Sequence, residues 1–169
     1  AGLENEVIEP TTIFKNLENK LNCGKFTITE HDKLPKNLSV EQILIRSSNI
    51  GAVRIAQQIG VKKYKDFLNS LELLNTINFD FEEVGTPIPF KWGKCKLATT
   101  SYGHGITTTP LQLVKAYAIL GNGGYNIEPY ILKNKKKPID NKKKIISEKT
   151  SSEINTILRK VVNLDEGTA

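Results

Sequence analysis

The sequence contains no methionine and begins with Ala1, so we expect an excerpt of a longer protein rather than a complete translation product. No apolar run approaches the roughly 20 residues that a membrane-spanning helix needs. Residues 1–10 also lack the basic-then-apolar order of a signal peptide. Nothing within the chain is therefore predicted to anchor it in a membrane.

Cysteine and histidine are scarce. Cys23 and Cys95 form no CxxC pair, and His31 and His104 lie far from each other and from both cysteines in the sequence. This spacing argues against a zinc site and against a Cys/His nucleophile, and we expect neither a metal nor another cofactor. The two cysteines are compatible with one disulfide or with two small buried thiols, and the sequence does not decide between them.

Basic residues are in excess, since 24 lysines and arginines against 18 acidic residues give a formal net charge of +6. The excess gathers in KNKKKPIDNKKK, residues 133–144. A lysine run can bind an anionic partner or form a solvated loop. Because no arginine or aromatic residue interleaves with these lysines, we expect a solvated loop and no nucleic-acid partner.

Helical periodicity dominates the rest of the chain. Residues 1–8 are typical of the end of a helix, stopped by Pro10. The pattern predicts further helices over residues 39–46, 50–60, 61–74 and 110–120, and a last one that opens at Ser147 or, with a Thr150/Glu153 capping box, at Thr150. Short strands are expected at residues 25–32 and 125–132, and an extended connector over 75–98. We predict one predominantly α domain with short β pieces and no nucleotide-binding βαβ alternation.

Ser47-Ser48-Asn49 lies between two stretches that would otherwise read as successive amphipathic helices. Short polar side chains compete with the helical backbone for hydrogen bonds, so they are favoured at helix caps and in functional sites. One hypothesis is a helix N-cap, and the other is a catalytic Ser-x-Asn. The tripeptide alone favours the cap.

Two longer segments change that balance: residues 46–60 read RSSNIGAVRIAQQIG, and residues 97–125 read LATTSYGHGITTTPLQLVKAYAILGNGGY. Together they resemble the transpeptidase domain of class B penicillin-binding proteins. That family has S-S-N followed by NIGxxxIAxxxG, and later SxGxGIxxTPLQLxxAYAxLxNGG. Residues 1–12 resemble the end of the helix after the family's nucleophile motif, and residues 146–162 resemble the helix before its last motif. The resemblance spans nearly the whole chain and favours the catalytic hypothesis.

The resemblance implies a peptidoglycan D,D-transpeptidase, in which the serine of an S-x-x-K motif attacks a D-Ala-D-Ala stem peptide or a β-lactam mimic. It gives Ser47 the role of a relay hydroxyl, passing a proton between the motif's lysine and the leaving amine. Asn49 is the orienting amide and Ser48 the variable middle residue. Tyr102 and His104 either wall the substrate cleft or only shape the glycine loop, since Ser/Lys chemistry requires no imidazole.

The chain departs from the family pattern because it contains no S-x-x-K, K-T-G or K-S-G. Residues 12–15, TIFK, have the first spacing but lie past the expected position, and residues 167–169 resemble only the stretch shortly before the last motif. We therefore expect residues 1–169 to be one partial domain, truncated at both ends and inactive alone. It would hold mainly the all-helical part of the α/β, β-lactamase-like fold.

The resemblance further implies a parent protein anchored in the bacterial inner membrane and working in the periplasm, in cell division or elongation. Other cell-wall synthesis or division proteins are its expected partners. One alternative is a related serine β-lactamase or D,D-carboxypeptidase, although the TPLQL segment favours the transpeptidase. Another is a non-catalytic helical module that binds an anionic partner through its basic loop, with the lysines Lys135, Lys136, Lys137, Lys142, Lys143 and Lys144.

Overall fold

The computed structural model describes residues 1–80, 85–131 and 143–168. The chain divides into two compact units, each with its own hydrophobic core. Unit 1 consists of Ala1–Tyr64, Lys91–Gly105 and Thr156–Ala169, whereas unit 2 consists of Lys65–Phe90 and Ile106–Asn155. All four residues that the sequence puts forward for a site belong to unit 1.

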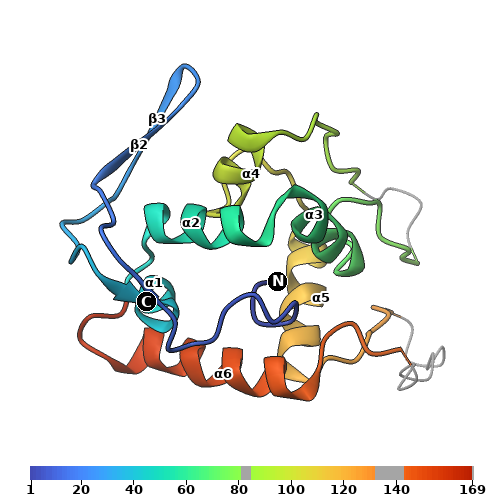
Figure 1. Ribbon diagram of the computed structural model, residues 1–169. Coiled ribbons are helices and arrows are strands. Elements are labelled where there is room, and N and C mark those ends of the chain that lie inside the picture. The colour runs from blue at the N-terminus through green and yellow to red at the C-terminus, as the bar shows by residue number, and fades with distance from the viewer. Residues whose placement is uncertain (81–84, 132–142, 169) are drawn as a thin grey trace. The chain divides into compact units, whose positions relative to one another are not determined.

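Within the described ranges the helices are α1 (Val40–Ile45), α2 (Asn49–Ile59), α3 (Val61–Ser70), α4 (Lys94–Thr100), α5 (Pro110–Gly121) and α6 (Glu148–Asn163). The strands are short and form two antiparallel pairs, β1 (Ile13–Phe14) with β4 (Leu38–Ser39) and β2 (Lys20–Cys23) with β3 (Phe26–Thr29). The β2–β3 pair is a hairpin (Figure 1). The prediction of a predominantly α fold with short β pieces is confirmed.

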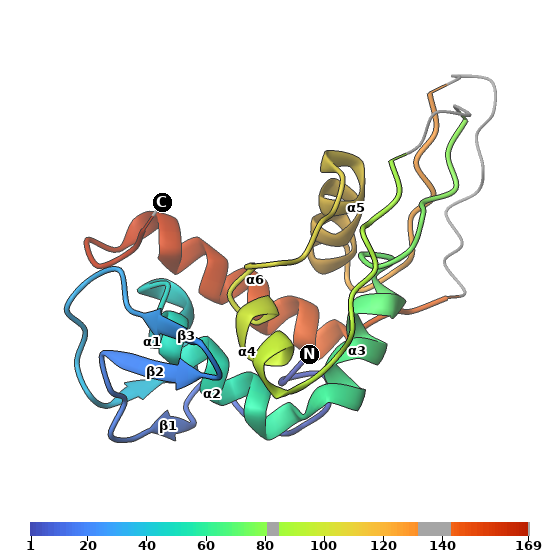
Figure 2. The same ribbon diagram turned by 90° about the horizontal axis from the view of Figure 1, so that it is seen from above.

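The core of unit 1 forms around α2, which contacts both α1 and α4 (Figure 2). Its apolar residues recur at helical spacing, so one face of the helix is buried. Burying each such side chain contributes about 1.5–3 kcal/mol before the entropy of ordering is subtracted. The cluster is formed by Ile8, Phe14, Leu17, Ile28, Leu38, Val40, Ile43, Ile50, Val53 and Ala98.

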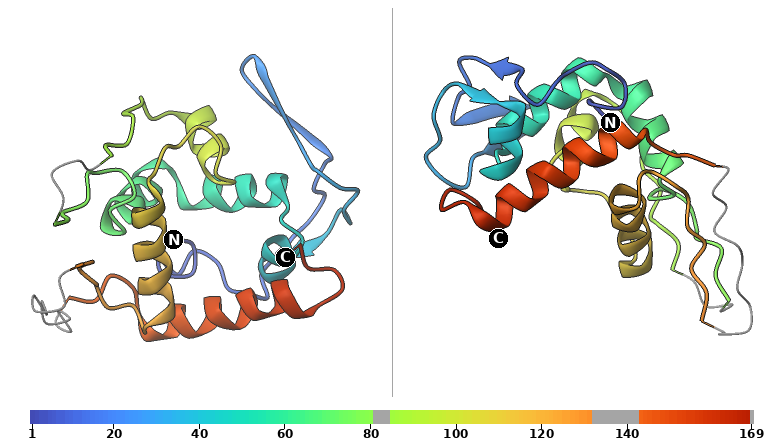
Figure 3. Two further views of the ribbon diagram at one scale, coloured as in Figure 1. Left: turned by 180° about the vertical axis from the view of Figure 1, so that it is seen from behind. Right: turned by 90° about the horizontal axis from the view of Figure 1, so that it is seen from below.

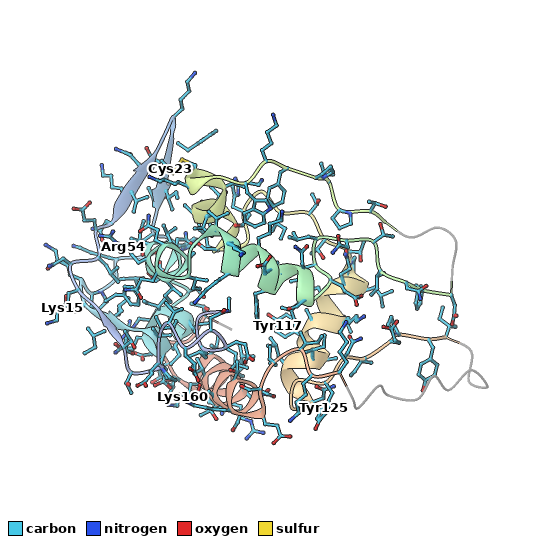
Figure 4. The ribbon with its side chains drawn as sticks, turned by 45° about the vertical axis from the view of Figure 1, so that its right-hand side comes forward. Lys15, Cys23, Arg54, Tyr117, Tyr125 and Lys160 are labelled. Atoms are coloured by element: carbon cyan, nitrogen blue, oxygen red, sulfur yellow. A yellow bond between two sulfur atoms is a disulfide. The ribbon has the colours of Figure 1, made fainter. Side chains whose placement is uncertain are left out.

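A disulfide between Cys23 and Cys95 fastens the hairpin to α4, with the two Cα atoms 5.4 Å apart (Figure 4). This answers the question that the sequence left open about these cysteines. The bond joins two parts of unit 1 that are 72 residues apart in the chain. Because Cys23 pairs with Phe26, the first residue of β3, the cross-link holds the hairpin at its turn.

In unit 2, the start of α5 is organised by the polar side chains of Thr109 and Gln112. Thr109 caps the helix in a capping box with Gln112, as Pro110 at the first helical position also favours. Gln112 is fully buried and donates from Nε2 to the backbone oxygens of Glu72 at 2.9 Å and Asn75 at 2.6 Å. These bonds tie the connector after α3 to α5.

Several predicted boundaries hold. The Ser39/Gln42 capping box opens α1, and Gly60 ends α2 with a φ of 79°. The stretch that opens the chain, predicted as the end of a helix, forms hydrogen-bonded turns over residues 2–6, with Asn5 N–H bonded to Ala1 O. It ends at Glu6, whose φ is 53°, because Val7 N–H bonds to Gly2 O and Glu6 N–H to Leu3 O.

Other boundaries were wrong. The predicted helix 61–74 ends at Ser70, since Glu72 adopts a left-handed φ of 58°. The predicted connector 75–98 contains the start of α4, which is too short to show a helical period and is held by burial of its apolar face. The predicted strand 125–132 forms only a single bridge, from Tyr125 to Lys144, within the described residues.

The last helix opens at Ser147, whose Oγ accepts from Thr150 N–H at 3.1 Å, so the alternative Thr150/Glu153 box was wrong. From there α6 runs to Asn163, and the chain after it turns back toward α1 (Figure 3). None of the helices in the described parts is long and apolar enough to cross a membrane.

Most of the lysine run 133–144 lies outside the described residues. At its described end, Lys144 Nζ lies 2.8 Å from Glu148 Oε1 and 5.0 Å from the centre of the Tyr125 ring. The hydrogen bond to Glu148 raises the pKa of Lys144. The binding of an anionic partner stays a prediction.

Candidate functional site

The turn between α1 and α2 places the three polar residues in three different environments. Ser47 follows the last turn of α1 in the left-handed region, with a φ of 51°. Its N–H donates to Leu44 O at 3.2 Å, and the next N–H, of Ser48, donates to Ile43 O at 2.9 Å. This pair of bonds is the Schellman helix ending, whose left-handed position glycine normally occupies. Serine there costs stability of order 1 kcal/mol.

Ser48, rather than Ser47, is the helix cap. Its Oγ accepts from Gly51 N–H at 2.9 Å, which satisfies one of the free N–H groups at the start of α2. The side chain is buried, with 2% exposed. The cap hypothesis is thus correct for the middle residue of the tripeptide. Ser47 needs a different explanation, because its exposed hydroxyl caps nothing.

Glu30 is the residue that sequence reasoning missed. Its Oε2 accepts from Asn49 N–H at 2.8 Å, while Oε1 accepts from Ser48 Oγ at 2.7 Å and Ile50 N–H at 3.1 Å. A carboxylate at a helix N-terminus is favoured by the positive end of the helix dipole. Glu30 follows β3 directly and thus clamps the hairpin to the turn. One signal existed in the sequence, since the first turn of α2 has no acidic residue of its own.

Asn49 is half-buried at the start of α2. Its Nδ2 donates to the backbone oxygen of Thr29 at 2.9 Å, so the end of β3 also fixes the orientation of the side chain. A primary amide has a second N–H and an acceptor oxygen in addition to the group used here. The side chain can therefore be held by the hairpin and still bind another polar group.

Ser47 Oγ lies 2.6 Å from Thr168 Oγ1, in the segment after α6. The neighbouring Arg46 forms an ion pair with Glu166 of the same segment. The Ser47 hydroxyl thus touches a second hydroxyl and is otherwise exposed. This environment suits a side chain that exchanges a proton with a bound molecule, because a hydroxyl both donates and accepts.

Tyr102 and His104 lie beyond the end of α4, where their rings stack with centroids 6.2 Å apart and planes inclined by 17°. Tyr102 packs against the core of unit 1, whereas His104 is exposed. Gly103, at a φ of 86°, lets the chain turn between them. In the described part of the chain no hydrogen bond or ring contact joins either residue to Ser47 or Asn49. The structure thus brings Tyr102 and His104 into contact with each other, whereas Ser47 meets Thr168 and Asn49 meets Thr29 and Glu30.

Comparison with known structures shows a shared fold. The transpeptidase domain of penicillin-binding protein 3 from Burkholderia pseudomallei superimposes with a TM-score of 0.88 at 23% identity, covering 98% of this chain and 50% of that one. A protein from Atopobium parvulum, described as a putative peptidoglycan glycosyltransferase, gives 0.85 at 25% identity over 96% of this chain and 40% of that one. The chain therefore has about half the length of these structural relatives, or less.

Curated relatives match along most of the chain. A probable peptidoglycan D,D-transpeptidase FtsI from Caulobacter vibrioides is 29% identical over 98% of this chain and 28% of its own length. Stage V sporulation protein D from Bacillus subtilis is 32% identical over 72% of this chain and 21% of its own length. The family model described as the penicillin binding protein transpeptidase domain matches residues 1–169. The chain belongs to the family of penicillin-binding protein transpeptidase domains.

Proposed function

We propose that this chain is the central part of a serine D,D-transpeptidase domain, in which Ser47 is the relay hydroxyl and Asn49 the orienting amide. The observation that supports this most is the left-handed φ of 51° at Ser47. A non-glycine residue is kept in a costly conformation where its side chain caps nothing, and such strain gathers at functional sites. The cap itself is left to Ser48.

The proposed reaction is acyl transfer between peptidoglycan stem peptides. A serine outside residues 1–169, in an S-x-x-K motif, attacks the carbonyl between the two D-alanines; the bond to the terminal D-Ala breaks, and an ester forms. Ser47 passes the proton from the activating lysine to the leaving amine, and Asn49 holds the substrate carbonyl and the lysine. The amine of a second stem peptide then displaces the serine. A β-lactam acylates the same serine.

Four further residues belong to the proposed site. Thr29 and Glu30 hold Asn49 by its side chain and its N–H, so the orienting amide is fixed before substrate arrives. Tyr102 and His104 are proposed to wall the substrate cleft. Their stacked rings on a glycine turn give a rigid surface for a peptide.

We propose that the whole protein works on the periplasmic face of the inner membrane, with other cell-wall synthesis or division proteins. The names of the curated relatives support a role in the cell envelope. The Cys23–Cys95 disulfide agrees with an oxidising compartment, where such bonds persist.

Mass spectrometry of the full-length protein after treatment with penicillin tests the proposal. We expect a single covalent adduct on the serine of an S-x-x-K motif outside residues 1–169. Residues 1–169 themselves should carry no adduct. An adduct on a serine within them, or none anywhere on a protein shown to be folded, would contradict the proposed function.

A further inference from the structure

The segment that follows α6 returns to the Ser47 turn and contacts it through alternate residues (Figures 1 and 3). Glu166 forms an ion pair with Arg46, and Thr168 Oγ1 lies 2.6 Å from Ser47 Oγ. Two neighbouring residues at the end of α1, Arg46 and Ser47, thus contact two residues of the segment, Glu166 and Thr168, that have one residue between them. Such matched spacing indicates a docked segment rather than one chance contact.

Gly167 fixes the path between these two contacts. Its N–H donates to Leu164 O at 2.8 Å, and the chain here folds tightly over the last turn of α6. A Cβ at this position would lie 2.0 Å from Val161 O and 3.0 Å from Leu164 O. Both neighbours are backbone atoms, which cannot move aside as a flexible side chain can. Only glycine allows the close turn that brings Thr168 to Ser47.

The ion pairs hold the segment and the end of α6 against α1. Lys160 pairs with Glu41 in the first turn of α1, and Arg46 pairs with Glu166 at its end. The Arg46 and Glu166 side chains are both about two-thirds buried or more. Arg46 Nε is buried without a hydrogen-bond partner in the described structure. The guanidinium therefore depends on Glu166 for compensation of its charge.

A serine hydroxyl rotates about χ1 and about its own C–O bond, so a relay serine must be held in one orientation to accept from one group and donate to another. The Ser47 side chain is exposed. In the described part of the chain its hydroxyl makes one hydrogen bond, and the partner is Thr168. This bond is the one available means of holding the rotamer.

We propose that Thr168 is a positioning residue that holds the Ser47 hydroxyl in its working rotamer. Glu166 and Gly167 fix the path of the segment that places Thr168 beside Ser47. The proposal rests on the proposed function of Ser47. Thr168 itself touches neither the attacking serine nor the leaving group. It acts only through Ser47.

The test measures the second-order rate constant for acylation of the full-length protein by a labelled penicillin, as a function of pH. Thr168→Val removes the hydroxyl and keeps the shape, whereas Thr168→Ser keeps the hydroxyl. We expect about a tenfold slower acylation for Thr168→Val, the scale of one hydrogen bond, and nearly unchanged acylation for Thr168→Ser. The pH profile of Thr168→Val should approach that of Ser47→Ala.

A double-mutant cycle separates this role from a structural one. In a Ser47→Ala background, Thr168→Val should slow acylation no further, because the residue through which it acts is gone. An additive effect in that background, or unchanged acylation in the single Thr168→Val variant, overturns the proposal even if Ser47→Ala itself is slow. If Ser47→Ala is as fast as the wild type, the proposed function fails, and this inference falls with it.

Discussion

Two helix ends in this molecule share the same backbone conformation, but the side chains at their left-handed positions make different contacts. Ser47 in unit 1 and Glu72 in unit 2 both occupy the left-handed position of a Schellman ending, with φ of 51° and 58°. Glu72 contacts other residues of unit 2: its backbone oxygen accepts from Gln112 Nε2, and its carboxylate lies 2.7 Å from Lys115 Nζ. Ser47 presents an exposed hydroxyl, whose one hydrogen bond among the described residues is to Thr168.

The two residues differ in how far the side chain offsets the cost of the left-handed backbone. At Glu72 the side chain offsets the backbone cost, because it compensates the charge of Lys115, whose side chain is 2% exposed. At Ser47 one exposed hydrogen bond between hydroxyls offsets little of a cost of order 1 kcal/mol. A residue retained at a net cost to stability is a candidate for function. Substitutions at the two positions should therefore change different measurements.

The largest effect is expected from Ser47→Ala in the full-length protein. Loss of a relay group slows acylation by a labelled penicillin about 100-fold or more, since general acid–base groups contribute on that scale. The melting temperature should stay nearly unchanged, because Ala and Ser have similar backbone costs at this position. Asn49→Ala should likewise slow acylation.

The neighbouring serine is the matched control. Ser48→Ala removes the helix cap and should lower the free energy of unfolding by about 1 kcal/mol while acylation stays within a few-fold of the wild type. If Ser48→Ala slowed acylation and Ser47→Ala only lowered stability, the two serines would have exchanged roles and our account would be wrong.

Glu72→Gln tests the other side of the comparison. Removing the charge that compensates a buried lysine should lower the free energy of unfolding by about 2 kcal/mol, as measured by denaturant titration. The loss is smaller than for a fully buried pair because Glu128 Oε1 also lies 3.6 Å from Lys115 Nζ. A variant as stable as the wild type would show that the carboxylate does not offset the strain of this turn.

Glu30→Gln should weaken the clamp on the turn between α1 and α2. The glutamine side chain has one acceptor oxygen where the carboxylate has two. At least one of the three groups that donate to Glu30 therefore loses its partner. We expect a loss of about 1.5 kcal/mol in the free energy of unfolding, in the range for hydrogen bonds to a charged group. Glu30→Asp keeps the charge but has a shorter side chain, and it should also lower the free energy of unfolding. An unchanged free energy of unfolding in both variants would show that Glu30 does not stabilise this turn.

Two glycine variants separate the backbone cost of each turn from the role of its side chain. Ser47→Gly should raise the free energy of unfolding by about 1 kcal/mol, since glycine accepts the left-handed conformation, and should still abolish the relay. Glu72→Gly should instead lower stability, because the lost ion pair exceeds the backbone gain. Chemical denaturation of both variants measures the two signs. A loss of stability for Ser47→Gly would mean that its hydroxyl is structural.

Local signals explain what the sequence predicted well. The helices predicted at residues 39–46, 50–60 and 110–120 have ends made by neighbouring residues, at Ser39, Gly60 and Thr109, so such helices can be found without the fold. The Ser-x-Asn hypothesis came from the polar interruption and from the family resemblance together, and the roles of Ser47 and Asn49 stay a proposal. In each case the residues that decide the outcome are close in the sequence.

The features that the sequence did not predict depend on distant partners. Glu30 caps a helix that begins 19 residues later, and Thr168 meets Ser47 across 121 residues. The helix 94–100 buries Leu97, Ala98 and Thr100, and Glu72, in the turn after α3, pairs with Lys115. No local pattern records which distant group completes such an arrangement, because propensity is a weak prior that tertiary contacts override.

A crystal structure of the full-length protein acylated by a penicillin would show where Ser47 and Asn49 lie relative to the acylated serine. We predict that Ser47 Oγ and the Asn49 side-chain amide both lie within hydrogen-bond distance of the acyl group or of the lysine beside it, with Thr168 still bonded to Ser47. A structure in which the two side chains face bulk solvent, away from the acylated serine, would contradict the account.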